Sequence, residues 1–381
     1  MNTEISRPDE KFVKENRISS RPVRGGRMRG CLLFLALTAA VPALAQQDFT
    51  LPSFKLSSGT PLLVQSGSSG AVVGQGGNYT VAIPDGGVLW LLNNIWLGES
   101  REDGQHAVWG LVEGAAAISR STDPYSQSGS LAYVSEENGW PLSLLSSDLK
   151  EYSQARKFRP RAGTYAGGRY YAFYSVLNNY GPGFYDYFRV GQGLAWSDKS
   201  SGPYQKISVD GGGPAWNDIE PAFGSALLSD EDGWVYIYGR VMTEPGKYGA
   251  ALARVQPEDL RLGERYSYYS VEAATGAWTG DVSEASVVLE NVPEEFSVSY
   301  NEFLKSYLAI SLDQASGEVR ARQAACPWGP WSEGAVLLSC KEADYCEGAK
   351  EHPVFASDGG RRVFLTLEKK NVPYLYSATF K

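Results

Sequence analysis

Glu220 has the surroundings that best suit an acid catalyst. It lies between Ile219 and a Pro-Ala-Phe segment at 221–223. Apolar neighbours exclude water from a carboxyl group, which raises its pKa and keeps it protonated near neutral pH. A protonated carboxyl group in that state can deliver a proton to a leaving oxygen. The alternative is a solvated glutamate in the loop before a strand.

Two further carboxylates lie beside aromatic and amide side chains. Glu302 directly follows Tyr300 and Asn301. Asp186 belongs to a loop containing Gly and Pro that is crowded with aromatic residues, namely Tyr180, Phe184, Tyr185, Tyr187 and Phe188. Aromatic faces with a few polar groups line ligand pockets, and they suit a ring that offers C–H faces and hydroxyl groups. In the alternative reading, Asp186 pairs with Arg189, Glu302 lies in a surface turn and the aromatic residues pack between sheets.

The elements that must position these residues repeat one pattern five times. A turn, usually rich in Gly or Asp, leads into a segment of alternating residues that is typical of the inner hairpins of antiparallel sheets. The copies begin about 55 to 80 residues apart, which is the length of a four-stranded propeller blade with its loops. They lie at residues 85–92, 166–176, 231–241, 304–312 and 358–368. The pattern predicts an all-β fold, a five-bladed β-propeller, with a pair of β-sandwiches as the alternative.

Both ends of the predicted propeller carry strand patterns. Residues 51–65 resemble an extra N-terminal strand, and residues 374–380 form the last strand of the final blade. Circular propellers often close by pairing two such strands. No linker or charge run divides residues 46–381, so we predict a single propeller domain there.

Residues 1–45 have the pattern of a secretory signal peptide. Three arginines between 24 and 29 precede an apolar run at 31–41, and a small-x-small cleavage site follows at 43–45. The run is too short to span a bilayer comfortably, and Met28 is an alternative start. We therefore predict a secreted or periplasmic protein without a membrane span.

Charge and cysteine usage restrict the partners. Without the leader the chain holds 27 basic and 39 acidic residues, a net charge of −12. This balance argues against nucleic acid, which requires a basic footprint. The aromatic loop at 180–188 favours a polysaccharide or oligosaccharide as the partner, and we expect a monomer. An oxidising compartment permits a disulfide, and Cys340 with Cys346 is the preferred pair.

Several segments, taken in their order, carry a family resemblance. They are RPRAGTYAGGRYYAFYS at 159–175, GLAWSDKSSGPYQK at 193–206, NDIEPAFGSALLSDEDGWVYIYGR at 217–240, FSVSYNEFLKSYLAISL at 296–312, PWGPWSE at 327–333 and CEGAKEHPVFASDGGRRVFLTL at 346–367. They resemble the five-bladed glycosidases around glycoside hydrolase family 43. More closely they resemble the domain-of-unknown-function family 4185, some members of which are endo-D-arabinanases. The resemblance covers most of residues 70–381.

The resemblance implies hydrolysis of a furanoside bond by two carboxyl groups on different blades. Glu220 matches the Glu of the third-blade Glu-Pro motif and would be the general acid. Asp186 matches by location an acid that tunes the general acid or holds substrate. Glu302 would bind a sugar hydroxyl or supply the second carboxylate. Tyr180, Tyr185, Tyr300, Asn301 and Asn94 are the residues that we expect to bind substrate.

The first blade departs from the family pattern. Gly76 and Asn94 stand where the resemblance places carboxylates, and neither residue can act as a base. Glu99, Asp103 and Glu113 in the same blade are the alternatives. A secreted propeller that binds polysaccharide without cleaving it is therefore the competing hypothesis, and a protein-interaction scaffold is a weaker one.

His352 is the candidate metal-binding residue. The resemblance places a His-Pro pair just before the last inner strand, where such a histidine helps to hold a central metal ion through water molecules. The implied ion is a structural Ca²⁺ in the central channel, and catalysis would require no cofactor. No clustered Cys and His spacing predicts zinc.

Overall fold

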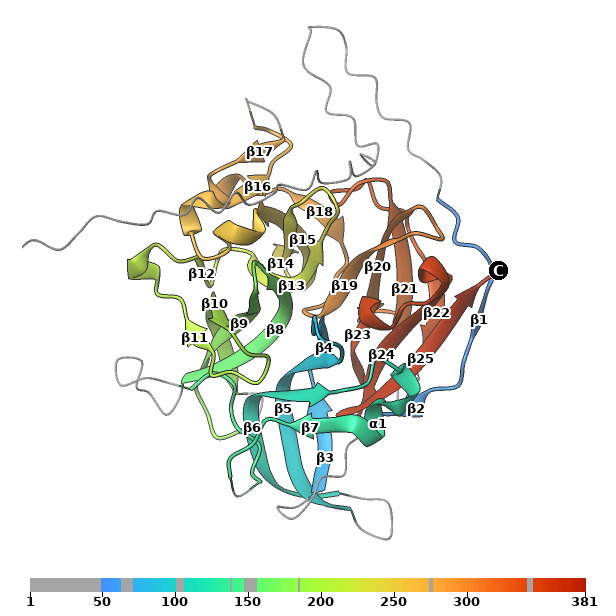
Figure 1. The fold of residues 1–381 in the computed structure, drawn as a ribbon. Helices are drawn as coiled ribbons and strands as arrows, with labels where there is room; N and C mark the ends of the chain where they lie inside the picture. Colours follow the sequence, from blue (N-terminus) through green and yellow to red (C-terminus); the bar gives the residue numbers. More distant parts are fainter. Residues whose placement is uncertain are drawn as a thin grey trace, which may run out of the picture.

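The structure is a computed structural model that describes residues 49–62, 71–100, 106–137, 139–146, 156–183, 186–273, 277–340 and 345–381. These residues form five antiparallel sheets arranged around a central axis, as Figure 1 shows. The prediction of an all-β, five-bladed propeller is thereby confirmed. The predicted signal peptide lies outside the described residues.

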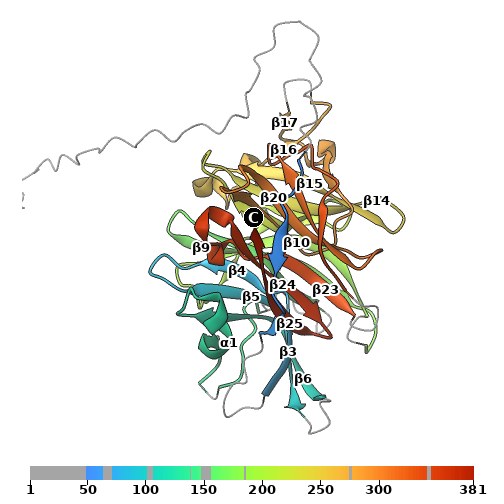
Figure 2. The same cartoon turned by 90° about the vertical axis from the view of Figure 1, so that its right-hand side faces the viewer.

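The first two blades contain the longest strands. Blade 1 consists of β3 (Ala71–Gly76), β4 (Tyr79–Ala82), β5 (Val88–Ser100), β6 (His106–Ser119) and β7 (Leu131–Tyr133). Blade 2 consists of β8 (Arg156–Ala166), β9 (Arg169–Asn179), β10 (Tyr187–Ser197), β11 (Gln205–Lys206) and β12 (Ala215–Asn217). In the side view of Figure 2, the ends of β3 and β6 project away from the rest of the molecule.

The other three blades complete the ring. Blade 3 consists of β13 (Ala222–Ser229), β14 (Val235–Glu244), β15 (Lys247–Val255), β16 (Ser267–Tyr269), β17 (Trp278–Thr279) and β18 (Val287–Glu290). Blade 4 consists of β19 (Phe296–Asn301), β20 (Ser306–Asp313), β21 (Glu318–Ala324) and β22 (Ala335–Ser339). Blade 5 consists of β23 (Cys346–Glu351), β24 (Arg362–Lys369), β25 (Val372–Phe380), β1 (Phe54–Leu56) and β2 (Thr60–Pro61).

Helical structure among the described residues is limited to single turns. The α-helix α1 (Gln127–Ser130) is the longest. The 3₁₀ turns are Pro124–Ser126, Val209–Gly211, Pro257–Asp259, Gly263–Arg265, Val282–Glu284, Pro353–Phe355 and Asp358–Gly360. None of these helices is long and apolar enough to cross a membrane.

The five repeated segments form the second strands of the five blades, β5, β9, β14, β20 and β24. In each blade a tight turn reverses the chain from the inner strand. The turn between β13 and β14 shows why glycine is required: Gly233 has a φ of 88°, which residues with a β-carbon rarely adopt. Turn chemistry therefore fixes where each second strand begins.

A separate apolar core fills the space between each pair of neighbouring blades. Blades 5 and 1 meet around Trp90, blades 1 and 2 around Leu91, and blades 2 and 3 around Phe173. Blades 3 and 4 meet around Tyr238, and blades 4 and 5 around Leu365. All five side chains are fully buried. The unbroken succession of interblade cores closes the ring.

A strand pairing and a disulfide connect blade 5 to the rest of the chain. Phe54 of β1 lies opposite Phe380 of β25, as expected from the strand pattern near the N-terminus. Cys340 and Cys346 form the predicted disulfide, with a Cα–Cα distance of 6.2 Å. It joins the end of β22 to the start of β23, and so links blade 4 to blade 5.

Candidate active site at one end of the channel

The inner strands of all five blades line a narrow channel. A cavity of about 60 Å³ lies between β4, β8, β13, β19 and β23. Its walls include Tyr79, Ala162, Ala226, Phe296 and Lys350. A space of this size holds a few water molecules and no sugar ring. A substrate must therefore bind at an end of the channel.

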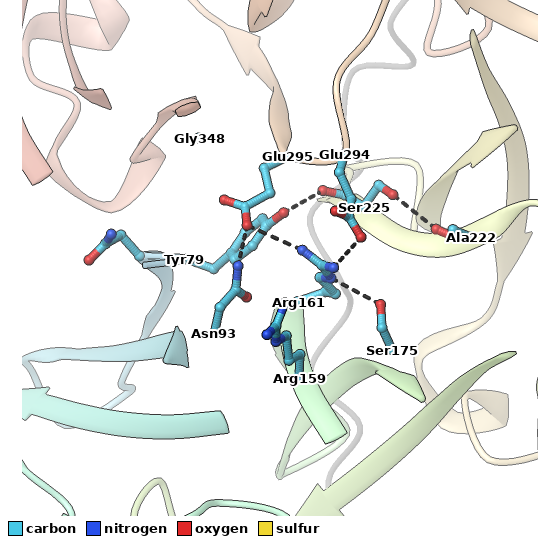
Figure 3. A network of polar contacts seen from close by, with 12 residues as sticks. Tyr79, Asn93, Arg159, Arg161, Ser175, Ala222, Ser225, Glu294, Glu295 and Gly348 are labelled. Atoms are coloured by element: carbon cyan, nitrogen blue, oxygen red, sulfur yellow. Dashed lines mark hydrogen bonds and ion pairs between the residues drawn. The ribbon is translucent and has the colours of Figure 1, made fainter. Parts of the chain in front are cut away.

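Arg161 organises the polar contacts where β4, β8 and β19 meet. It lies on β8, is 3% exposed and donates from Nε to the hydroxyl of Ser175 at 3.0 Å. Its terminal nitrogens form salt bridges with Glu294 and, at 3.2 Å, with Glu295. Figure 3 shows the guanidinium group between these two carboxylates and Arg159. Glu295 also accepts a hydrogen bond from the amide of Asn93 in blade 1.

Lys350 provides the second cation of this network. Its buried ammonium group donates to Glu295 at 2.7 Å and to the backbone carbonyl of Gly348 at 2.8 Å. The Glu368 carboxylate lies 4.0 Å away. A further hydrogen bond to the carbonyl of Gly77 connects blade 5 with blade 1. Lys350 thus compensates carboxylates from two blades in a site that excludes water.

A β-bulge in β23 creates the room for these carboxylates. The register between β23 and β24 shifts between Glu347 and Lys350. Gly348 lies in the bulge with a φ of 66°, and a β-carbon there would lie 2.9 Å from Glu368 and 3.1 Å from Glu295. The glycine therefore meets both a backbone and a steric requirement.

A second ion-paired group lies beside the first. Glu113 of β6 accepts from Lys157 at 2.8 Å and from Nε of Arg159 at 2.8 Å. Burial would raise the pKa of Glu113, but Arg159 and Lys157 hold it below its usual value. The Arg159 guanidinium also lies 4.2 Å from the ring centroid of Tyr187. Blade 1 thus contributes an ionised carboxylate at the edge of the site.

Glu294 and Glu347 differ in the direction of their pKa shifts. Burial would raise the pKa of Glu294, but the guanidinium groups of Arg161, Arg240, Arg159 and Arg189 hold it below its usual value. Burial raises the pKa of Glu347, and the neighbouring Glu295 raises it further. Both side chains are half-buried. One carboxyl group is thus kept ionised and the other is held towards its protonated form.

Glu220 lies at the same end of the channel, in the turn before β13. Its carboxylate accepts a hydrogen bond from the backbone N–H of Asn217 at 2.7 Å. Its own carbonyl accepts from Arg189 at 2.9 Å. Ile219, which was expected to shield the carboxyl group, is 84% exposed. The side chain therefore closes a local turn, and the apolar surroundings expected from the sequence are not formed on that side.

Asp186 also stabilises its own loop. Its carboxylate accepts from the backbone N–H of Gly183 at 2.8 Å. Arg189, its alternative partner, donates to backbone carbonyls of residues 217, 218 and 220 instead. Tyr180 is 69% exposed and stacks on Phe188 at 6.4 Å between ring centroids. Tyr185 lies outside the described residues.

Glu302 lies at the opposite end of the channel. It follows the last residue of β19, whereas Glu294 and Glu295 precede the first, a separation of roughly 20 Å along a strand. Its carboxylate accepts from Lys305 at 3.2 Å in the hairpin turn. The preceding Asn301 is buried and donates to the carbonyl of Gly360 at 2.8 Å. Tyr300 packs edge-on against Tyr307. The structure thus brings Glu220 and Asp186 to one end of the channel, and Glu302, Tyr300 and Asn301 to the other.

The two blade 1 positions without carboxylates lie opposite each other. Gly76 pairs with Asn94 between β3 and β5. A β-carbon at Gly76 would lie 2.6 Å from the Asn94 amide oxygen and 3.4 Å from Glu368 of blade 5. Of the alternatives within blade 1, Glu113 reaches the site, Glu99 lies near the far end of β5, and Asp103 falls outside the described residues. The carboxylates near this position therefore come mainly from blades 4 and 5.

Hydroxyl groups contact both ring nitrogens of His352. Its Nδ1 lies 3.1 Å from the hydroxyl of Thr80, and its Nε2 lies 2.9 Å from the hydroxyl of Thr366. Burial, with Lys350 nearby, lowers its pKa to about 3. Both ring nitrogens are engaged, and the described residues contain no group of three His, Cys, Asp or Glu side chains placed to hold a metal. Direct ligation of a calcium ion by His352 would require one of these two contacts to break, and the predicted contact through water molecules stays a prediction.

The central side chains of the site were missed by sequence reasoning, although two signals mark them. Glu294 and Glu295 form an acidic pair directly before an inner strand, much as Glu220 precedes β13. Arg159 and Arg161 alternate along β8 and so share one face. Lys350 carried no comparable signal, because only the bulge in β23 turns it towards Glu295.

The fold and the charged end of its channel define a five-bladed β-propeller with a candidate active site. The family model for a domain of unknown function, DUF4185, matches residues 101–379, and the chain belongs to this family. No protein of curated function matches it.

Solved structures share the fold, among them the following two. A protein from Bacteroides ovatus ATCC 8483, named as a candidate hydrolase, is 18% identical with a TM-score of 0.61, and the match covers 82% of this chain and 87% of that one. An exo-β-1,3-galactanase from Phanerochaete chrysosporium, solved with β-1,3-galactotriose, is 11% identical with a TM-score of 0.52. That match covers 84% of this chain and 64% of the galactanase.

Proposed function

We propose that this protein is a secreted glycoside hydrolase that acts on a furanose-containing, arabinan-type polysaccharide. The observation that carries the proposal is the pair Glu294 and Glu347 at one end of the channel. Both are half-buried, and their pKa values are shifted in opposite directions. Hydrolysis of a glycosidic bond requires such a pair, with one protonated and one ionised carboxyl group.

In this proposal Glu347 protonates the leaving oxygen. Its raised pKa keeps the proton available when the substrate binds. Glu294 is the ionised partner that activates water or attacks the sugar. Arg161 orients Glu294 through their salt bridge, and the Ser175 hydroxyl holds Arg161 in place.

Glu220 remains the second candidate for the acid, as the family resemblance implies. Its turn lies at the same end of the channel, beside Arg189. Acting as the acid requires that its carboxylate release the Asn217 N–H. Asp186 would then hold its loop, and the exposed rings of Tyr180 and Phe188 would bind the sugar chain.

Binding without cleavage is the second candidate function. Glu294 and Glu295 both pair with Arg161, which stabilises them as structural anions. Gly76 and Asn94 also leave blade 1 without a carboxylate at the positions where the family resemblance places them. Under this alternative the site recognises the polymer and leaves it intact.

The test is product release from arabinan and arabinogalactan by the protein without its leader. We expect release by the wild type and loss of at least a hundredfold in Glu347→Gln and Glu294→Gln. Glu302→Gln, at the other end of the channel, is the matched control and should retain activity. Loss in Glu220→Gln with an active Glu347→Gln would assign the acid to Glu220. Saturable binding without release would favour the non-catalytic function.

A further inference from the structure

Four arginines surround the site, and they fall into two pairs. Arg159 and Arg161 form salt bridges with Glu113, Glu294 and Glu295. Arg189 and Arg240 form no salt bridge with any carboxylate that the structure describes. Arg189 donates to three backbone carbonyls, and the Arg240 guanidinium lies 3.3 Å from the ring centroid of Tyr248. The second pair is therefore positioned without its charge being neutralised by a direct partner.

Burial and charge separate the two pairs further. Burial would lower the pKa of Arg161 and Arg159, but their carboxylate partners raise it instead. Burial lowers the pKa of Arg189 and Arg240, because Glu294 compensates their charge only partly. The Nε of Arg240 is buried and has no hydrogen-bond partner. A bound anion next to these two guanidinium groups would compensate their charge.

The location suits recognition of a ligand. Arg189 contacts the turn that leads into β13, and Arg240 on β14 pairs with Ala222, the first residue of β13. The positive charges of both guanidinium groups help to lower the pKa of Glu294, whose side chain is 40% exposed. This concentration of cations occurs in a chain with eight more acidic than basic residues. General electrostatic attraction to acidic polymers is therefore absent, and recognition must be local.

We propose that Arg189 and Arg240 bind an oxyanion carried by a sugar residue, either a uronate carboxylate or a sulfate ester, next to Glu294. Guanidinium groups match both anions through paired N–H donors. The inference refines the proposed function, because it places an acidic sugar in the same site. It does not require cleavage, since binding can be measured alone.

The test uses calorimetric binding to the Glu347→Gln protein, so that turnover does not interfere. The probes are trigalacturonate, a sulfated galactose oligomer and neutral arabinotriose. We expect an acidic probe to bind at least tenfold more tightly than arabinotriose, and Arg240→Gln to weaken the acidic probe about tenfold. Trigalacturonate and the sulfated oligomer distinguish the two sources of the anion.

Arg254 offers a matched control for Arg240. It is also half-buried, has a buried Nε without a hydrogen-bond partner, and lies between the rings of Trp234 and Trp278 at 4.3 and 4.0 Å. It is four residues beyond Ala250, the partner of Arg240, or about 13 Å along the sheet. Arg254→Gln should leave the affinity for every probe within twofold.

Salt dependence provides a readout that needs no variant. Raising NaCl from 50 to 500 mM should weaken the acidic probe several-fold and leave arabinotriose unchanged. Equal affinities for acidic and neutral probes, or equal loss of both in Arg240→Gln, would overturn the inference. Cleavage of neutral arabinan without preference for acidic probes would leave the proposed function intact. Tighter binding of an acidic probe without cleavage of any polymer would support the inference and contradict the proposed hydrolase function.

Discussion

Two buried side chains at the centre of the propeller have pKa values that are shifted in directions that their surroundings explain. Glu351 accepts a hydrogen bond from Ser299 at 2.7 Å, and burial raises its pKa to about 7. The adjacent His352 is kept neutral, with its pKa lowered to about 3. Unfolding would return both groups to ordinary values. Two neighbouring residues thus affect stability over the same pH range with opposite signs.

Replacing Glu351 by Gln should remove one of these effects. The folded pKa of Glu351 lies above its unfolded value, so its contribution is fully present below about pH 4 and is lost as the pH rises towards 7. The loss is about 3 kcal/mol at most. Relative to the wild type, Glu351→Gln should therefore gain free energy of unfolding by up to about 3 kcal/mol between pH 4 and 8. Urea denaturation at pH 4 and at pH 8 measures the free energy of unfolding of both proteins. A difference between variant and wild type that is the same at both pH values would contradict the assignment.

The pH dependence of catalysis should reflect the raised pKa of Glu347. If this residue supplies the proton, kcat/KM falls as the pH rises through its raised pKa. Glu295 is, after burial, the largest cause of that shift, so Glu295→Gln should move the alkaline limb of the profile to lower pH. Glu302→Gln, the control, should leave the limb in place. An alkaline limb that does not move in Glu295→Gln would separate Glu347 from the acid step.

At the scale of elements, the local sequence determines where each strand lies, whereas the site depends on an irregularity, the bulge in β23. Turn residues, which are glycines in four of the five blades, and the alternating residues after them identified the second strand of every blade. The bulge in β23 was not recognisable, because the sequence Glu347–Lys350 carries no turn signal beyond a single glycine. The inner strands β19 and β23 have six residues each, and a one-residue shift moves every side chain to the other face. Residue types therefore predicted the propeller. The acidic pair Glu294 and Glu295 carried a sequence signal that was missed, and Lys350 emerged only from its three-dimensional placement.

The bulge gives a direct test of this dependence. Gly348→Ala places a methyl group at a φ of 66° and within 3.1 Å of both Glu368 and Glu295. We expect a loss of about 2 to 4 kcal/mol in the free energy of unfolding, from backbone strain and from displaced ion pairs. Gly246→Ala is the control, because it also has a positive φ but nothing lies within 4 Å of its β-carbon. Equal losses in both variants would show that strain alone accounts for the effect.

At the scale of the whole molecule, closure of the ring depends on a strand from the beginning of the chain. β1 pairs with β25 over three residues, and Phe54 packs against Phe380 and the core between blades 4 and 5. The disulfide between Cys340 and Cys346 joins the same two blades independently. Blade 5 also supplies Lys350, so loss of closure would reach the site as well as the fold.

Phe54→Ala measures how strongly β1 stabilises the ring. The side chain is half-buried, so we expect a loss of about 2 kcal/mol in the free energy of unfolding, less than for a fully buried phenylalanine. Lys55→Ala is the matched control, because Lys55 lies on the same strand and is exposed. Urea denaturation under oxidising conditions keeps the disulfide intact in all variants. If Phe54→Ala and Lys55→Ala unfold at the same urea concentration, β1 covers an edge without contributing to closure; a selective loss in Phe54→Ala would show that the interblade contact closes the propeller.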